Sequence, residues 1–320
     1  MIIDCHVHIS ALTPGHGCMS QRVLRSPPFR FIRWRLGIRG ENEATERALE
    51  KKLADTIVET AAIDAAVVLA FDAVYDDEGR LDNRNTHLHV SNDYAIKVCR
   101  RNPKMLFGAS VHPYRKDAVA EIERCVAAGA VLLKWLPIVQ NFDPSDDRCI
   151  PVYEAIAHHG LPLLSHTGGE KSLPNLNVNV MDPALLLRAL QRGVTVIAAH
   201  CGTRSKSSET DFLPTFMRMA KEHERFFGDT AALCLPTRSY AFPKLMADRT
   251  VMEKLVHGSD WPIPCLPPAT ILGLMKSLGL MTDANWMRRD VATKRRLGFD
   301  DAYFHRAAGL LKYKPTTVRY

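Results

Sequence analysis

Residues 131–135 (VLLKW), 162–165 (PLLS) and 194–199 (VTVIAA) are three short apolar runs, and an amphipathic stretch follows each of the first two. Each run has the length of a buried strand. From residue 131 onward such runs begin about 25 to 32 residues apart, the length of one strand–loop–helix unit. The pattern predicts parallel strands joined by crossover helices.

Apolar runs of this kind recur along the whole chain. The eight candidate strands are Ile2–Val7, Ala65–Phe71, Met105–Val111, Val131–Trp135, Pro162–Ser165, Val194–Ala199, Phe226–Thr230 and Lys254–His257. Eight strand–helix units predict a closed (β/α)8 TIM barrel, with residues 1–320 as a single domain. A doubly wound open sheet is the alternative, but neither G-x-G-x-x-G nor a P-loop follows any run.

Amphipathic segments between the runs predict the helices. They are 43–63, 91–102, 117–128, 151–159, 182–193 and 211–224. The last segment, residues 266–320, is expected to add two or three C-terminal helices after Pro268. Asp182-Pro183 is typical of a helix start, with Asp as the cap and Pro in the first turn.

Residues 10–40 form the largest irregular segment, a long loop directly after the first strand. It contains six arginines within residues 22–39, interleaved with Phe29, Phe31 and Trp34. Loops after the strands line the active face of a barrel, so one interpretation of this segment is a lid or an anion-binding wall. The favoured interpretation is a solvated basic loop or an oligomer contact.

Composition bounds the partners. The chain of 320 residues is 46% hydrophobic and 24% charged, which is ordinary for a soluble globular protein. Its net charge is +7, but much of the excess lies in residues 22–39 and 288–296, with no zinc-finger, RNA-recognition or helix-turn-helix pattern. We therefore expect no nucleic-acid partner.

The location of the protein is predicted from what the sequence lacks. The eight cysteines form no C-x-x-C pair, no signal peptide is visible, and no apolar run reaches the length of about 18 residues that a membrane span needs. We expect a cytoplasmic protein with no membrane partner.

Metal-ligating side chains stand at the ends of four predicted strands. His6 and His8 are two residues apart at the end of the first run, so both can face one side and share a metal. His166 and His200 each follow an apolar run directly, and Asp260 follows the last run. Because the carboxyl ends of barrel strands converge on one face, these side chains are expected to meet there.

In combination these motifs resemble the amidohydrolase superfamily, and within it the amidohydrolase-2 branch. That branch includes aminocarboxymuconate semialdehyde decarboxylase, resorcylate-type decarboxylases and lactone hydrolases. The resemblance extends from Ile3 to about Pro264 and rests on Asp4-Cys5-His6-Val7-His8, Ser165-His166-Thr167-Gly168, Ala199-His200-Cys201-Gly202 and Gly258-Ser259-Asp260-Trp261-Pro262. Softer matches are Asn92-Asp93-Tyr94 and Lys134-Trp135-Leu136-Pro137.

The resemblance implies a catalytic metal centre with one divalent ion, most often zinc. It implies the ligand set His6, His8, His166 and Asp260, a water that completes the coordination, and His200 and Asp260 as the catalytic residues. Lys134 leaves a binuclear alternative open, because a carboxylated lysine at the end of strand four bridges two metals in some members. His166 and His200 would then hold the second ion, whereas other relatives use the lysine for substrate or structure. A site without catalytic metal, as in some lactonase relatives, is the third alternative.

The leading prediction is a metal-dependent hydrolase that uses a metal-activated water on an amide, lactone or related carbonyl. The substrate is a small molecule, expected to be anionic because of the basic first loop. The alternative is a metal-dependent non-oxidative decarboxylase of a hydroxy-aromatic or related carboxylic acid. His112, at the end of the third run, is expected either to reach the substrate or to be a hydrogen-bonded loop residue. The resemblance also leaves a homodimer open.

Overall fold

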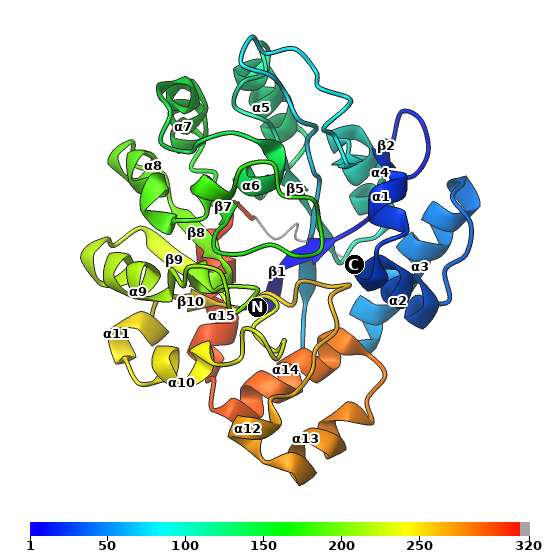
Figure 1. The fold of residues 1–320 in the computed structure, drawn as a ribbon, viewed down its shortest axis with the longest axis vertical. Coiled ribbons are helices and arrows are strands. Elements are labelled where there is room, and N and C mark those ends of the chain that lie inside the picture. The colour runs from blue at the N-terminus through cyan, green and yellow to red at the C-terminus, as the bar shows by residue number, and fades with distance from the viewer. Residues whose placement is uncertain (314–320) are drawn as a thin grey trace, which may run out of the picture.

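Eight parallel strands form the centre of the computed structural model, which describes residues 1–313 (Figure 1). They pair in the order β1-β3-β5-β6-β7-β8-β9-β10. Their bounds are β1 Ile3–His8, β3 Ala65–Leu69, β5 Met105–Ala109, β6 Leu132–Trp135, β7 Leu163–His166, β8 Val196–Ala199, β9 Phe226–Asp229 and β10 Leu255–Val256. All eight predicted strands are therefore confirmed.

Hydrogen bonds between the first strand and the segment of β10 close the barrel. The amide of Cys5 donates to the carbonyl of His257 at 3.0 Å, and the amide of His8 donates to the carbonyl of Trp261 at 2.7 Å. The predicted single-domain (β/α)8 barrel is confirmed. It brings the carboxyl ends of the first and last strands side by side.

Helices surround the strands (Figure 1). They are α3 Glu43–Glu59, α4 Asn92–Arg101, α5 Ala118–Ala127, α6 Pro137–Gln140, α7 Ile150–His158, α8 Leu187–Gln191, α9 Leu213–Glu222, α10 Ala241–Met246 and α11 Arg249–Met252. The predicted helix 182–193 is divided, because a 3₁₀ turn over Pro183–Leu186 precedes α8. Asp182 caps that turn by accepting from the amide of Ala184, as Asp-Pro predicted.

Strand alternation sets which side chains face the barrel interior. Leu132, Leu164 and Ile197 belong to the interior cluster, while Leu133 and Leu163 pack outward with the helices. Side chains two residues apart on a strand share a face. Lys134 and His166 therefore stand inside, one layer above Leu132 and Leu164.

The first strand departs from this alternation. Ile3 and Cys5 face the interior cluster, so strict alternation would turn His6 and His8 outward. The pairing with β3 shifts in register between Asp4 and Val7. Such an irregularity re-aims side chains. His6 and His8 consequently line the same pocket as the interior residues.

The segment 10–40 is not irregular as expected. It contains β2 Gly17–Met19, α1 Gln21–Leu24 and α2 Pro27–Leu36, and β2 pairs antiparallel with β4 Leu88–Val90. Ser26-Pro27-Pro28 supplies prolines in the first turn of α2, and Gly37 ends the helix in the left-handed conformation (φ 68°). The segment thus has regular secondary structure over much of its length.

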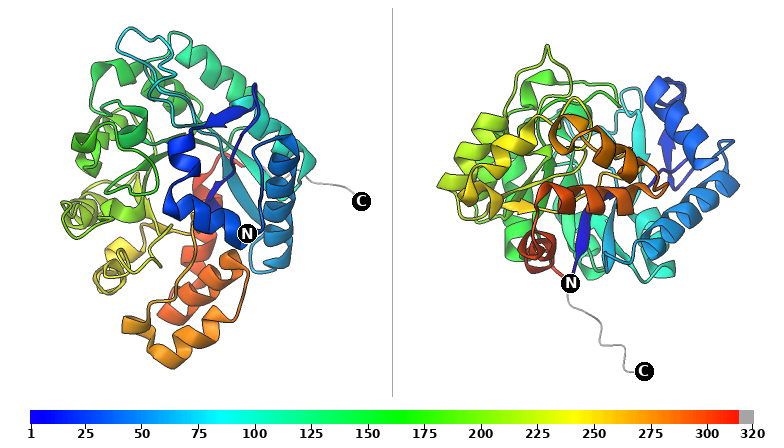
Figure 2. Two further views of the ribbon diagram at one scale, coloured as in Figure 1. Left: turned by 45° about the vertical axis from the view of Figure 1, so that its right-hand side comes forward. Right: turned by 90° about the horizontal axis from the view of Figure 1, so that it is seen from below.

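The first three of the C-terminal helices form a group on one side of the barrel (Figure 2), and the last packs against β1 and β10. Four helices are found among the described residues, where two or three were expected: α12 Ala269–Leu272, α13 Leu274–Met281, α14 Trp286–Leu297 and α15 Asp301–Leu310. Residues 314–320 of the predicted C-terminal segment lie outside the described part. None of the helices described in residues 1–313 is both long and apolar enough to cross a membrane.

Candidate active site

Three side chains at the carboxyl ends of neighbouring strands form a compact donor cluster. The Nε2 atoms of His6 and His8 lie 3.1 Å apart. Oδ1 of Asp260 lies 3.4 Å from His6 Nε2 and 3.1 Å from His8 Nε2. Asp260 has a left-handed backbone (φ 65°), and its amide donates to the carbonyl of His6, which turns its carboxylate toward the histidines. The structure thus brings together three of the four predicted metal ligands.

His166, the fourth predicted ligand, lines the same pocket from the end of β7. Its Nε2 is buried and has no hydrogen-bond partner among the described residues. An unpartnered buried nitrogen is costly in a folded protein unless it has a ligand. The geometry therefore leaves this nitrogen available to a metal or a substrate.

Lys134 and His200 complete the polar floor of the pocket. Lys134 is buried, and its Nζ lies 3.2 Å from His6 Nε2. His200 has a left-handed backbone (φ 61°), and its ring lies 4.8 Å from that of His166 and 5.2 Å from that of His6, between centroids. The six residues predicted as ligands, catalytic residues or metal bridge, namely His6, His8, Lys134, His166, His200 and Asp260, all line one pocket.

Asp229, at the end of β9, is a residue that the sequence analysis missed. It is fully buried, and its Oδ2 lies 2.7 Å from His6 Nδ1. Its Oδ1 accepts from the amides of His200 and Ala231 at 2.8 and 3.0 Å. One carboxylate therefore fixes His6 with Nδ1 as the donor, so that Nε2 carries the lone pair that a metal needs.

Burial sets the protonation of the histidines. Desolvation first, then the charge of Lys134, holds the pKa of both His6 and His166 well below its usual value. Desolvation and then Arg238 do the same to the pKa of His200. The three rings are therefore neutral, which is the form that ligates metals or accepts protons.

The two remaining charged groups keep their charge. Burial favours a raised pKa for Asp260, but the histidines beside it hold that pKa below its usual value, so the carboxylate is ionised. Burial lowers the pKa of Lys134 to about 8, against the opposing pull of Asp229 and Asp260. Lys134 is consequently still a cation near neutral pH.

The donor set fits a divalent cation. His6, His8 and Asp260 each offer one ligand atom, and these atoms lie within 4.8 Å of one another. The two imidazole nitrogens face the carboxylate, with the unpartnered nitrogen of His166 on the same pocket. Nitrogen and oxygen ligands with an open position are typical of catalytic zinc, and manganese and cobalt also accept such sets.

The walls of the pocket are apolar. They include Phe29 and Ile32 from α2, and beyond these Ile9, Phe71, Leu88, Leu136, Leu173, Pro262 and Ile263. The pocket holds about 740 Å³ of space, part of it open to solvent. The helix α2 therefore forms part of the wall over the site.

The arginines of residues 22–39 form no wall around the histidine cluster, although Arg33 lines a smaller cavity beside it. Arg22, Arg25, Arg30, Arg35 and Arg39 are exposed, and no arginine of residues 22–39 lines the pocket. Arg33 lies 3.6 Å from Glu41 and donates to the carbonyl of Gly40. The arginines alternate with the apolar side chains around α2, so the apolar face turns to the pocket and the basic face to solvent. The solvated basic surface is the interpretation that the structure supports.

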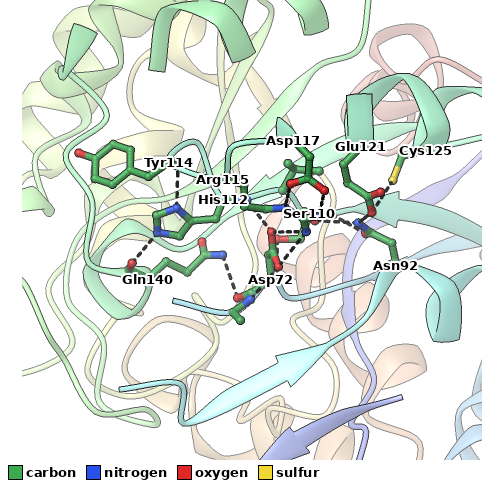
Figure 3. A network of polar contacts seen from close by, with 12 residues as sticks. Asp72, Asn92, Ser110, His112, Tyr114, Arg115, Asp117, Glu121, Cys125 and Gln140 are labelled. Atoms are coloured by element: carbon green, nitrogen blue, oxygen red, sulfur yellow. Dashed lines mark hydrogen bonds and ion pairs between the residues drawn. The ribbon is translucent and has the colours of Figure 1, made fainter. Parts of the chain in front are cut away.

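A polar network that includes the loop after β5 explains two weaker sequence signals (Figure 3). His112 does not reach the pocket, because its Nε2 lies 2.8 Å from the carbonyl of Gln140 and its Nδ1 accepts from the amide of Tyr114. Asn92 joins α4 to β5 through two hydrogen bonds with the backbone of Ser110, at 2.9 and 3.0 Å. Both residues connect elements of the barrel to one another, and neither lines the pocket.

Arg238 is the second residue that the sequence analysis missed. It is buried, and its guanidinium donates to the carbonyls of Gly169 and Thr203 and to the hydroxyl of Thr203. It thereby ties together the loops after β7 and β8, which carry His166 and His200. Nothing in its local sequence, Pro236-Thr237-Arg238-Ser239, marks it as different from a surface arginine.

Comparison with known proteins places the chain in a family. The family model described as Amidohydrolase matches residues 3–288. No curated protein matches the sequence of this chain.

Solved structures with the same fold are distant in sequence. An uncharacterised TIM-barrel protein from Bordetella bronchiseptica has a TM-score of 0.59 at 17% identity and covers 92% of this chain and 97% of its own. A putative 2-pyrone-4,6-dicarboxylic acid hydrolase from Pseudomonas putida has a TM-score of 0.55 at 17% identity, over 97% and 94%. A 5-carboxyvanillate decarboxylase from Novosphingobium aromaticivorans, with bound manganese, has a TM-score of 0.53 at 11% identity, over 96% and 94%. The family match over most of the chain, on a barrel with this fold, shows that the protein belongs to the amidohydrolase family.

Proposed function

We propose that the protein is a metal-dependent hydrolase acting on an amide, lactone or related carbonyl. The observation that carries the proposal is that two proton acceptors, the Asp260 carboxylate and the His200 ring, line one pocket beside the histidine cluster. Hydrolysis needs a group that takes a proton from water and returns it to the leaving group.

The orientation of His200 defines its role. Its Nδ1 lies 2.8 Å from the carbonyl oxygen of Ala231, so Nδ1 must be the donor of that hydrogen bond. Because the ring is neutral, Nε2 carries a lone pair. His200 can therefore orient water or accept its proton, whereas direct protonation of a substrate carbon would need the charged ring that burial disfavours.

His6, His8, His166 and Asp260 would hold the divalent ion, which when bound acidifies water and polarises a carbonyl. Asp229 keeps His6 in the ligating tautomer. Asp260, ionised in this pocket, would receive the proton of the attacking water and deliver it to the leaving atom.

The pocket walls indicate the substrate class. The nine apolar residues around the site favour a flat or aliphatic body, and Lys134 is the one basic amine among the pocket residues, suited to a single carboxylate or phenolate. A second apolar cavity of about 470 Å³ adjoins the first and shares Ser10, Phe29, Ile32 and Pro262 with it. We infer an apolar substrate with one anionic group and an extended apolar substituent.

A non-oxidative decarboxylase is the second candidate, and Lys134 is the observation that favours it. A buried ammonium in an apolar pocket binds a carboxylate without competing water. Similarity to both a pyrone-dicarboxylate hydrolase and a carboxyvanillate decarboxylase supports both reactions.

One substrate panel tests both candidates. The metal-loaded protein would be incubated with apolar-substituted aromatic lactones and pyrones, and separately with hydroxy-aromatic carboxylic acids. Ring-opened acid with release of a proton and without CO₂ supports the hydrolase. Release of CO₂ from the carboxylic acids establishes the decarboxylase and overturns the hydrolase.

A His200→Asn variant tests whether His200 takes part in turnover. It should lose turnover while retaining its metal content, because His200 is not in the ligand set. The matched control is His112→Asn, which changes a buried histidine outside the pocket. Normal turnover of His200→Asn would contradict the role given to His200.

A further inference from the structure

A second cluster of metal-ligating side chains lies outside the active site. Cys234, in the loop after β9, Cys265, in the segment after β10, and Asp290, on α14, place their ligand atoms within 4.8 Å of one another. All three are buried. Cys234 Sγ lies 3.4 Å from Asp290 Oδ1, and Cys265 Sγ lies 3.7 Å from the hydroxyl of Thr293. Two sulfurs and one carboxylate oxygen therefore converge in a water-poor space.

His257 gives an independent indication of a missing ligand. It is 1% exposed, and neither of its ring nitrogens has a hydrogen-bond partner among the described residues. Its Nδ1 lies 3.8 Å from Asp290 Oδ2, the oxygen that pairs with Lys294, so the ring lies next to the cluster. Its other neighbours are the rings of Tyr303 and Phe304 at 6.2 and 5.2 Å between centroids, which offer no polar partner through their faces.

Asp290 divides its two oxygens between two kinds of partner. Oδ2 lies 2.5 Å from Nζ of Lys294, which also donates to the carbonyl of Gly258 at 2.8 Å. Oδ1 faces Cys234 and remains available as a ligand. The ion pair with Lys294 therefore holds the carboxylate in place without occupying the oxygen that faces the thiols.

From this arrangement we propose a structural zinc site with Cys234, Cys265 and Asp290 as ligands and His257 beside it. Two thiolates with carboxylate and imidazole suit zinc, and thiolates select it over harder cations.

Charge balance supports the same ion. Without metal, the cluster holds two neutral thiols and the Asp290–Lys294 ion pair. When a divalent ion binds, each thiol releases one proton, so two protons leave as two positive charges arrive. The buried cluster therefore keeps the same net charge in both forms.

The site would brace the active centre from behind. Cys234 follows Asp229 along the loop after β9, and Cys265 follows Asp260 along the segment after β10. Lys294 binds the carbonyl of Gly258, two residues before Asp260. The bound ion would link the loop after β9 and the segment after β10 to α14. It would thereby hold Asp229, which orients His6, and Asp260, which belongs to the donor cluster.

Cobalt substitution tests the proposal. Metal-depleted full-length protein would be titrated with Co²⁺ alone, and a thiolate-to-cobalt charge-transfer absorption in the near ultraviolet is expected. The active centre has only nitrogen and oxygen donors, so a His8→Asn variant should keep this absorption. Cys234→Ser and Cys265→Ser should lose it, while Cys125→Ser, a buried thiol on α5, should not.

Two results with the cobalt-loaded protein would overturn the proposal. Absence of thiolate absorption in the cobalt-loaded wild type overturns the proposal, as does its persistence in a folded Cys234→Ser protein. All eight thiols should react in denaturant without reductant. Reaction of only six would show one disulfide, and peptide mapping that assigns it to Cys234 and Cys265 would equally overturn the zinc site. These readouts do not depend on turnover, so they are independent of the proposed hydrolase activity.

Discussion

Asp229 determines which ring nitrogen of His6 carries the proton and which is free to bind a metal. Asp229→Asn would place an amide donor or a weaker acceptor against His6 Nδ1 and favour the tautomer protonated at Nε2. We expect metal affinity and turnover to fall by about 10- to 100-fold, as for other residues that orient ligands. Metal titration and kcat/KM measure this.

The control for this variant is Asp182→Asn, since asparagine also caps a helix. It should leave metal affinity unchanged. Equal metal affinity of Asp229→Asn and wild type would contradict the orienting role of Asp229.

Asp4 makes the stability of the metal-free protein depend on pH. Burial raises its pKa from 3.8 to about 7, although its Oδ1 accepts from the amides of Ser259 and His6. A folded pKa above the unfolded one means that stability is full below about pH 4 and falls as pH rises through 7. The slope from this group is at most about 1.4 kcal/mol per pH unit.

Asp4→Asn removes this titration. Urea unfolding of chelator-treated protein at pH 5 and at pH 7.5 should show a smaller loss of stability in the variant than in the wild type. An identical loss in both proteins would mean that Asp4 does not titrate in this range.

Sequence reasoning at the residue scale found the residues that end strands and carry a ligand side chain. Asp229 gave a different signal, an acidic residue near the end of the predicted strand Phe226–Thr230, and the search for ligands directly after the strands passed over it. Arg238 gave none, because its role depends on two loops that meet only after the barrel has closed.

The loops after β7 and β8 pack without space between them. A Cβ added at Gly168 (φ +76°) would overlap the carbonyl oxygen of Thr203 and lie 2.7 Å from the carbonyl carbon of Gly202. Gly160 has a similar φ of +59°, but a Cβ there meets nothing within 4 Å. The pair separates the cost of the backbone conformation from the cost of the contact.

Gly160→Ala should lower the free energy of unfolding by about 1–2 kcal/mol, the cost of a left-handed alanine. Gly168→Ala should lower it by about 1–3 kcal/mol more, because backbone must move. Chemical denaturation of both variants measures the difference. Equal losses would show that the two loops do not depend on this close approach.

We expect the side chains of α2 that line the pocket to contribute to substrate affinity. Ile32 is buried and lines both apolar cavities, whereas Trp34 on the same helix is 74% exposed. For the best substrate of the panel, Ile32→Ala should raise KM by about tenfold with unchanged metal content. Trp34→Ala should change neither. A KM that responds to Trp34 and not to Ile32 would place the substrate elsewhere.

At the element scale the sequence predicted the strands of the barrel better than the short helices of residues 10–40. The apolar runs recur at regular intervals, so every strand was found. The helices of residues 10–40 are short and arginine-rich, and the apolar face of α2 consists of only a few residues among them. The register shift in β1 depends on pairing with β3 and cannot be deduced from one strand alone.

At the scale of the whole molecule, the fold was predicted correctly because one strand–helix unit repeats along most of the chain. Eight strand–helix units leave few topologies open, so the closed barrel and the convergence of strand ends could be predicted. The position of each residue relative to the others, including the compact set His6, His8 and Asp260 and the more distant His166, needed the closed structure. The reaction itself depends on substrate contacts that neither sequence nor fold specifies.

Metal content tests the central claim most directly. Protein purified without chelator would be compared with a His6→Asn/His8→Asn double variant by elemental analysis, with folding checked by circular dichroism. We predict a difference of about one divalent ion per chain, independent of any ion at Cys234 and Cys265, together with loss of turnover. Equal metal content in the two folded proteins would contradict a catalytic metal centre at the mouth of this barrel.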